Sequence, residues 1–402
     1  MPRRTSTEHP VRTPLPRGFW VIWSTVALDL IGFGIVVPIL GRYAERFGAG
    51  GVAVGLLFAS FSLAQFVFAP LLGRLSDRIG RKPVLLVSLF GTAAASFLTG
   101  AAGALWLLFV ARVLDGASGA SVAVAQGAVT DMVEPDERPR ALGLLGAAFG
   151  VGFVLGPVLG GLASLGGVHL PFYIAGSLAL LNAIVAIRRV PETRRAGDNA
   201  ARSERDGRAV RIWSIAIASF LAVSAFAGFE ATFALLSQRR FDLKEGGVAV
   251  VFIGIGLLLV LVQGVMVRPI TKVFGSARTL EAGLVINGAG LLLLAFAERW
   301  LLLVPALALL TLGQGLVTPS LTLLVTRRVP EQHRGEALGF QQGVSAIARV
   351  AGPAVAGVLF QHVSVGAPYV LGAGLCAVAL GLAFSGSARR EAAGDRARIP
   401  MG

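Results

Sequence analysis

The sequence predicts an all-α membrane protein, with twelve transmembrane helices in two pseudo-symmetric six-helix bundles. Three observations lead to this prediction: the composition, the number of long apolar stretches and an internal repeat. Of the 402 residues, 55% are hydrophobic and only 14% are charged, against about 25% charged in an ordinary soluble domain. This composition excludes a soluble globular enzyme, and a single cysteine, Cys376, excludes a disulfide scaffold.

Long apolar stretches define the predicted elements, because a helix needs about 20 apolar residues to cross the hydrocarbon core of a bilayer. Six stretches precede a polar segment at 188–211, which has the composition of a flexible charged linker, and six follow it. The predicted spans are 18–40, 51–72, 83–102, 104–130, 141–163, 170–187, 212–237, 247–267, 279–297, 300–326, 337–360 and 367–386.

The basic residues give the orientation of these spans. If the N-terminus is inside, 28 of the 36 Lys and Arg residues lie on inner segments and six lie in outer loops. This bias predicts that both termini are cytoplasmic. The net charge of +14 is then a sign of membrane topology, and no nucleic-acid partner is expected. The predicted organisation is a cytoplasmic tail (1–17), an N-terminal bundle (18–187), the cytoplasmic linker (188–211), a C-terminal bundle (212–386) and a cytoplasmic tail (387–402).

The two bundles resemble each other at an offset near 195 residues. RALGLLGAAFGVGFVLGPVLGG (140–161) matches EALGFQQGVSAIARVAGPAVAG (336–357), and Gly80 falls opposite Gly275. Two repeated halves are typical of secondary transporters, whose substrate site lies between the halves near the middle of the membrane. We therefore expect a small-molecule substrate.

The connection after the second span reads GRLSDRIGRKPVLL (Gly73–Leu86). A positive inner loop would account for its Arg and Lys residues but not for Asp77 or its paired glycines, which permit tight turns. The segment resembles the cytoplasmic signature loop of the major facilitator superfamily. The resemblance implies that Asp77 faces the start of the eleventh span and latches one conformation, supported by Arg78 and Arg81. The predicted latch loop comprises Gly73, Asp77, Arg78, Gly80, Arg81 and Lys82.

The second-half copy of this loop reads RPITKVFGSAR (268–278). It has Lys272 where Asp77 would fall, so we expect no equivalent latch there.

The fifth span carries glycines at a spacing of four, which present a flat helix face to a neighbour. Ordinary small-residue packing accounts for this face by itself. The complete pattern, with a proline, resembles the antiporter motif of drug:proton antiporters, and that resemblance implies export. The motif residues are Gly152, Gly156, Pro157, Gly160 and Gly161.

Five charged residues fall inside predicted spans: Asp29, Arg112, Asp115, Glu230 and Arg349. Intramembrane charges are costly and usually functional, so we expect roles in proton coupling or substrate binding. Arg112 and Asp115 lie on one helical face and could instead neutralise each other. Arg349 has no acidic neighbour in sequence, so Asp29 or Glu230 would have to supply its partner.

Two of these charges lie in segments that resemble known transporters. The first span, with Asp29, resembles that of tetracycline and multidrug exporters. The segment around Arg112 and Gly116 resembles a family motif associated with proton coupling.

Several glutamines could line a cavity, or could form hydrogen bonds between helices. These residues are Gln65, Gln126, Gln263, Gln314, Gln341 and Gln342, together with Asn182 and Asn287, and with Gln238 at the outer mouth. The four histidines show no metal-binding spacing, and the absence of a P-loop disfavours ATP-driven transport. We expect no metal and no cofactor other than the proton gradient.

The resemblance as a whole implies a monomeric drug:proton antiporter in a bacterial inner membrane, exporting amphipathic or cationic molecules. A proton-coupled importer of a sugar or metabolite and a lipid or lysolipid transporter on the same fold are alternatives. A receptor that transports nothing would have little use for the intramembrane charges.

Overall fold

The computed structural model describes residues 14–49, 51–193, 209–243, 245–330 and 333–396. Every regular element in these ranges is helical, which confirms the predicted all-α class. Most of the predicted N-terminal tail, most of the linker and the last six residues of the C-terminal tail lie outside the described residues. The elements are α1 (Arg17–Glu45), α2 (Gly51–Ile79), α3 (Arg81–Gly100), α4 (Leu105–Ser118), α5 (Ser121–Met132), α6 (Arg138–Ser164), α7 (Leu170–Arg189), α8 (Ala209–Phe241), α9 (Glu245–Leu261), the π-helix η1 (Val262–Met266), α10 (Val267–Ala295), α11 (Trp300–Arg328), α12 (Arg334–His362) and α13 (Ala367–Arg396).

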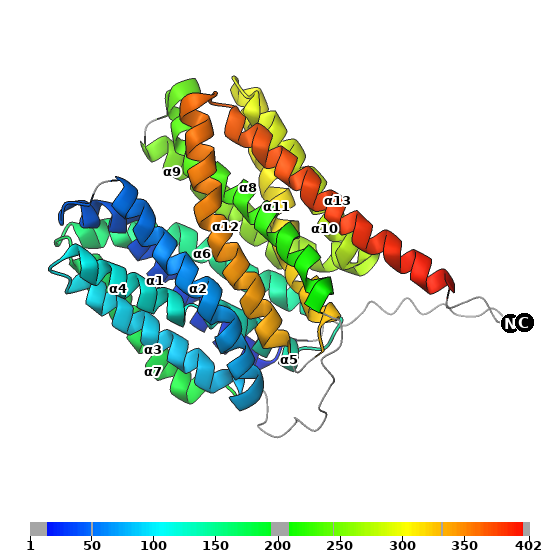
Figure 1. The fold of residues 1–402 in the computed structure, drawn as a ribbon, viewed down its shortest axis with the longest axis horizontal. Coiled ribbons are helices and arrows are strands. Elements are labelled where there is room, and N and C mark those ends of the chain that lie inside the picture. The colour runs from blue at the N-terminus through cyan, green and yellow to red at the C-terminus, as the bar shows by residue number, and fades with distance from the viewer. Residues whose placement is uncertain (1–13, 50, 194–208, 244, 331–332, 397–402) are drawn as a thin grey trace, which may run out of the picture.

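The helices form two bundles, one from α1–α7 and the other from α8–α13 (Figure 1). Ten described helical segments are long and apolar enough to cross a membrane. One of them, Val250–Ala295, is broken at Gly275 and supplies two predicted spans. α6 is not among the ten, but it packs between α1 and α9. A helix thus stands at each predicted span, while twelve crossings of a bilayer remain a prediction.

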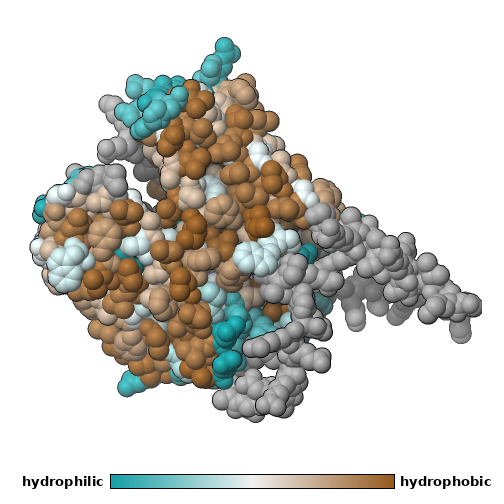
Figure 2. Space-filling model, viewed as in Figure 1, coloured by the Kyte–Doolittle hydropathy of each residue, from teal (hydrophilic) through white to brown (hydrophobic). Residues whose placement is uncertain are grey.

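The surface of the bundles suits a bilayer. Figure 2 shows hydrophobic side chains over most of the visible face and hydrophilic side chains gathered toward its ends. Many large apolar side chains are exposed, among them Trp106, Leu257 and Leu301, which are 64%, 64% and 84% accessible. Exposed apolar surface on this scale is stable against lipid but not against water.

The fourth predicted span, 104–130, is not one helix. α4 ends at Ser118 and α5 begins at Ser121, with Gly119 and Ala120 between them. The Gln65 side-chain amide donates a hydrogen bond of 2.6 Å to the Gly119 carbonyl, which therefore has a partner outside the helix. A polar side chain on a neighbouring helix can satisfy a backbone group that such a break exposes in a membrane.

Gly80 and Gly275 occupy equivalent positions in the repeat and share one backbone conformation. Their φ values are 108° and 77° and their ψ values are 158° and 162°, a region that strongly favours glycine. Gly80 alone separates α2 from α3, so the predicted loop is much shorter than the sequence suggested. Gly73 does not turn the chain, contrary to our prediction, because it lies inside α2.

Gly73 instead allows α2 of the first half to approach α12 of the second. A methyl group added to Gly73 would strike the Gly335 carbonyl, and one added to Gly339 would strike the Ala69 carbonyl. Gly343 continues the contact against the backbone of Phe66. We call this contact the α2–α12 seam. It lies at the end of the molecule that carries Gly80 and the first residues of the linker, which we call the linker end.

Asp77 joins the two halves at this seam. Its carboxylate accepts hydrogen bonds of 3.0 Å from the backbone N–H groups of Gly335 and Glu336, in the first turn of α12. A carboxylate is favourable there because the N–H groups and the dipole of a helix N-terminus attract negative charge. This is the position that the family resemblance implies for Asp77.

Arg81 holds the Asp77 carboxylate in place. The guanidinium is 1% exposed, with Nη1 2.8 Å from Asp77 and Nε 2.9 Å from Asp131. No contact between Arg78 and Asp77 is seen among the described residues, and the Arg78 side chain is exposed. The backbone N–H groups of Arg81 and Lys82 donate to the Glu192 carboxylate, which ties the start of α3 to the end of the first half.

A second seam joins α6 of the first half to α9, η1 and the start of α10 in the second. We call it the α6–α10 seam. Lys272 is exposed, and no carboxylate takes the place of Asp77. The two halves meet here through a different contact, because Arg268 forms an ion pair and hydrogen bond with Glu137. Arg140 lies 3.5 Å from the same carboxylate.

Replacing Asp77 with Asn should slow transport without weakening substrate binding. Asn retains one acceptor oxygen but loses the charge, and a hydrogen bond to a charged group is worth more than a neutral one, so we expect turnover to fall about tenfold or more. Transport in liposomes and equilibrium binding in detergent would be measured side by side. Weakened binding with normal turnover would contradict the latch role.

Glu137 and Arg268 should behave as one unit. Glu137→Gln and Arg268→Gln should each slow transport severalfold, because each removes the ion pair that joins the two halves at this seam. The double variant should be no slower than the slower single variant, since the interaction is lost only once. If the fold-reduction in the double variant equals the product of the two single reductions, the two residues act independently.

Candidate functional site: a central cavity between the halves

A cavity of about 560 Å³ lies between the two halves. Its wall is mostly apolar, with polar side chains contributed by both bundles. The hydrogen bonds and ion pairs that the described residues make between the halves all lie at the linker end, so the cavity is closed on that side. The volume lies within the range of pockets that hold drug-sized molecules.

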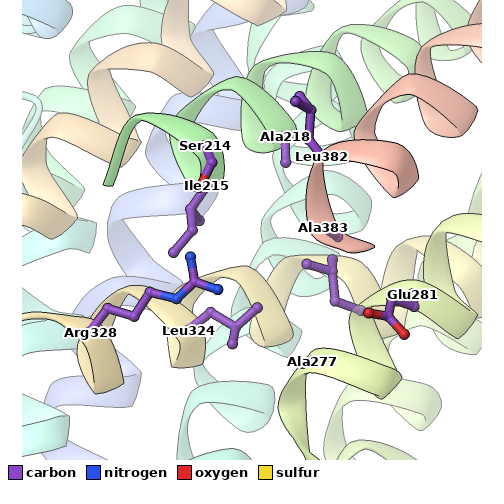
Figure 3. A pocket seen from close by; sticks show the side chains of 10 residues that line it. Ser214, Ile215, Ala218, Ala277, Glu281, Leu324, Arg328, Leu382 and Ala383 are labelled. Carbon is purple, nitrogen blue, oxygen red and sulfur yellow. The ribbon is translucent and has the colours of Figure 1, made fainter. Parts of the chain in front are cut away.

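A second pocket lies inside the C-terminal half at the linker end, and it is much smaller, at about 50 Å³. Figure 3 shows Arg328 and Glu281 on opposite sides of it. It has room for a few water molecules but not for an organic substrate. The central cavity is therefore the candidate transport site.

Four of the five predicted intramembrane charges line the central cavity: Asp29, Asp115, Glu230 and Arg349. Arg112 does not line it. Its side chain is 2% exposed, with Nη2 3.1 Å from Asp115 and the guanidinium carbon 5.8 Å from the centre of the Phe61 ring. Arg112 thus lies behind the wall, where it neutralises Asp115 and stacks on an aromatic face.

Asp29 receives a hydrogen bond of 2.5 Å from the Ser121 hydroxyl. Ser121 is the first residue of α5, so the break in the fourth span places this hydroxyl and a helix N-terminus beside the carboxylate. We did not predict Ser121 as a site residue. The polar run around Gly119 was visible in the sequence, but a broken helix was not.

Glu230 and Arg349 face the cavity from α8 and α12. Of the two carboxylates that we considered as partners of Arg349, Glu230 is the one whose charge acts on it. Although both residues are described, they form no ion pair within 4.0 Å, and the Arg349 side chain is exposed to the cavity. An unpaired cation and an unpaired carboxylate are thus available to a ligand or to water.

Most of the predicted glutamines line the cavity, and one of them also links two helices by a hydrogen bond. Gln65, Gln126, Gln314 and Gln341 line the cavity. Gln314 also accepts a hydrogen bond of 2.9 Å from Asn287, so it braces α10 against α11. Gln238 does not line the cavity, contrary to our prediction, because α8 continues past it to Phe241 and its side chain is exposed. Gln263, in η1, also lines the cavity.

The glycines of the fifth-span motif pack α6 against α1. Methyl groups added to Gly152, Gly156 or Gly160 would meet the backbone of Leu30, Gly34 or Ile35. Gly152 also lines the cavity, whereas Gly161 faces open space. The structure describes the helical backbone at Pro157 but not its side chain. The motif therefore fixes the helix that carries Asp29.

The described residues contain no group of three or more His, Cys, Asp or Glu residues that could hold a metal ion. What they bring together is a set of carboxylates, one guanidinium and several amides in an apolar cavity. Such a site can bind a charged amphipathic molecule and exchange protons with water.

Comparisons with known proteins agree with this architecture. The model of the Major Facilitator Superfamily matches residues 22–280 and 264–400. The chain is 32% identical to the class C tetracycline resistance protein of Escherichia coli, over 90% of this chain and 94% of that protein. It is 27% identical to multidrug resistance protein 1 of Bacillus subtilis, over 91% and 95%. The crystal structure of the human organic anion transporter MFSD10 superposes with a TM-score of 0.81 at 23% identity, covering 92% of this chain and all of that one.

The family model spans nearly the whole chain, and the relatives match it over almost their full length. The fold, the repeat and the loop around Asp77 agree with that match. The chain belongs to the Major Facilitator Superfamily.

Proposed function

We propose that the protein exports amphipathic or cationic small molecules in exchange for protons, by alternating access. The observation that carries the proposal is the central cavity, which is apolar, closed at one end and lined by carboxylates from both halves. The similarity to tetracycline and multidrug resistance proteins supports export of a drug-like molecule. The protein acts as a transporter and catalyses no covalent chemistry.

The topology gives the side of the membrane on which the cavity is closed. The linker end carries most of the Lys and Arg residues, so we place it in the cytoplasm together with both termini. The conformation described is then closed to the cytoplasm. In it, protons from outside reach Asp29 and Asp115, neutralise the carboxylates and weaken their hold on a cationic substrate, which leaves. The empty cavity then returns with its protons to the cytoplasmic side.

The bundles 18–187 and 212–386 are the two rocking units, and the linker 188–211 connects them. We place the monomeric protein in the inner membrane of a bacterium, with the proton gradient as its only energy source. The partners are the lipid bilayer, protons and the substrate.

Purified protein in liposomes should move a permanently charged dye such as ethidium when a pH gradient is imposed, and dissipating the gradient should stop the movement. A permanently charged dye is needed because a weak base would follow the gradient without a transporter. Liposomes with the Asp77→Asn variant provide the control. Dye movement that ignores the gradient would refute proton coupling, and movement down the proton gradient together with protons would favour an importer.

Asp29→Asn and Asp115→Asn should each reduce gradient-driven transport at least tenfold, because a neutral amide cannot release a proton at any physiological pH. In the same variants, dye movement down its own concentration gradient, without a pH gradient, should fall less than movement driven by the pH gradient. Glu281→Gln is a matched control, since Glu281 lines only the small pocket. If driven transport survives both substitutions unchanged, these carboxylates do not carry the protons.

A further inference from the structure

The break between α4 and α5 leaves two hydrogen-bond acceptors in the cavity wall without a donor. These are Oε1 of Gln65 and Oδ1 of Asp29, both shielded from water. The Gln65 residue is 5% exposed, and both residues line the cavity. A buried acceptor without a donor is costly, so the pair is suited to a ligand that supplies hydrogen atoms.

The orientation of the Gln65 amide is fixed by its neighbour. Its nitrogen lies 2.6 Å from the Gly119 carbonyl, which can only accept, so the nitrogen must be the atom on that side. The oxygen is then the free end. On the other side of the break, Ser121 binds Oδ2 of Asp29 and leaves Oδ1 as the free oxygen. Gly119 and Ser121 thus anchor the two side chains on the two sides of the break between α4 and α5.

An aromatic pair lies one helical turn from these acceptors. Phe33 follows Asp29 by four residues on α1, and Phe61 precedes Gln65 by four on α2, so each ring shares a helix face with one acceptor. The ring centroids are 5.7 Å apart, and both residues line the cavity. Because α1 and α2 run in opposite directions, both rings lie on the side away from the linker end.

We infer that this is a subsite for a protonated primary or secondary amine, with its N–H groups on Asp29 and Gln65 and its apolar body on Phe33 and Phe61. The inference rests on the proposed function and names the substrate class within it. A quaternary ammonium ion carries the same charge but no N–H group. The subsite therefore binds a protonated amine more tightly than a quaternary ammonium ion of the same charge. When the amine binds, the side chains of Asp29 and Gln65 turn toward the cavity.

Dansylcadaverine, a primary amine, and its N,N,N-trimethyl analogue form a matched pair of probes. Their binding to purified protein in detergent would be followed by dansyl fluorescence, because vesicles with a pH gradient trap the amine without any transporter. Two hydrogen bonds involving charge should give the amine about a tenfold lower Kd or better. Gln65→Met should remove most of this advantage and leave the Kd of the trimethyl probe within about twofold of wild type.

Asn182→Leu is the matched control. It removes an amide of the same half that is 2% exposed and also donates to a backbone carbonyl, that of Thr25, but does not line the cavity, so it should keep the preference for the amine. An unchanged Kd for the trimethyl probe shows that Gln65→Met is folded. If Gln65→Met does not fold, Gln65→Leu replaces it.

Equal affinity of wild type for the two probes would overturn the subsite, as would a loss shared equally by both probes in the Gln65 variant. Failure of the amine probe to bind wild type would also overturn it. These binding results do not depend on gradient-driven ethidium transport. That transport assay tests the proposed function separately.

Discussion

Asp77 reaches the amide groups of α12 only because two helix backbones touch. Gly73, Gly335, Gly339 and Gly343 remove the side chains that would otherwise hold α2 and α12 apart. At that separation one carboxylate can accept from two N–H groups of another half of the molecule. Closure of the linker end, and with it the shape of the cavity, depends on this approach. Helix backbones in direct contact cannot slide past each other gradually without a clash. The α2–α12 seam therefore favours two discrete conformations, closed and open at the linker end, over a continuous range.

α6 and α12 occupy equivalent places in the repeat and use glycine on two faces. On one face Gly156 of α6 packs on Gly34 and Gly352 of α12 packs on Ser224, so each helix is fixed to its own half. On the other face Gly143 of α6 meets Gln263 and Gly339 of α12 meets Ala69, across the division between halves. The first contacts hold whichever way the cavity opens, whereas the second must separate when the linker end opens. Glycine thus serves both kinds of contact, the permanent one within a half and the reversible one between the halves.

The spans, the repeat and the loop around Asp77 were predictable because each leaves a strong local mark: long apolar runs, a constant offset and a dense charge pattern. The break at Gly119 was not predictable, since it depends on Gln65 of another helix, and a few small polar residues within a long span do not by themselves end a helix. The ion pair between Glu137 and Arg268 joins residues 131 apart and lies outside the strict repeat. For Arg112 the sequence left two roles open, in coupling or in neutralising Asp115, because it gives the depth of a residue but not the direction of its side chain; the structure shows the ion pair with Asp115.

The two halves repeat their backbones but not their charges. At the offset that relates Gly80 to Gly275, the position opposite Asp29 is Ser224 and that opposite Glu230 is Ile35. Each half therefore carries its own set, Asp29 with Asp115 and Arg112 in one, and Glu230 with Arg349 in the other. If the halves rock as rigid units, no member of either set changes its partners within its own half. Only what lies between the halves changes, so a proton taken up in the first half can influence the second only through a shared ligand or through the two seams. The coupling of the proposed exchange must then be carried by the occupant of the cavity and by the contacts that close it.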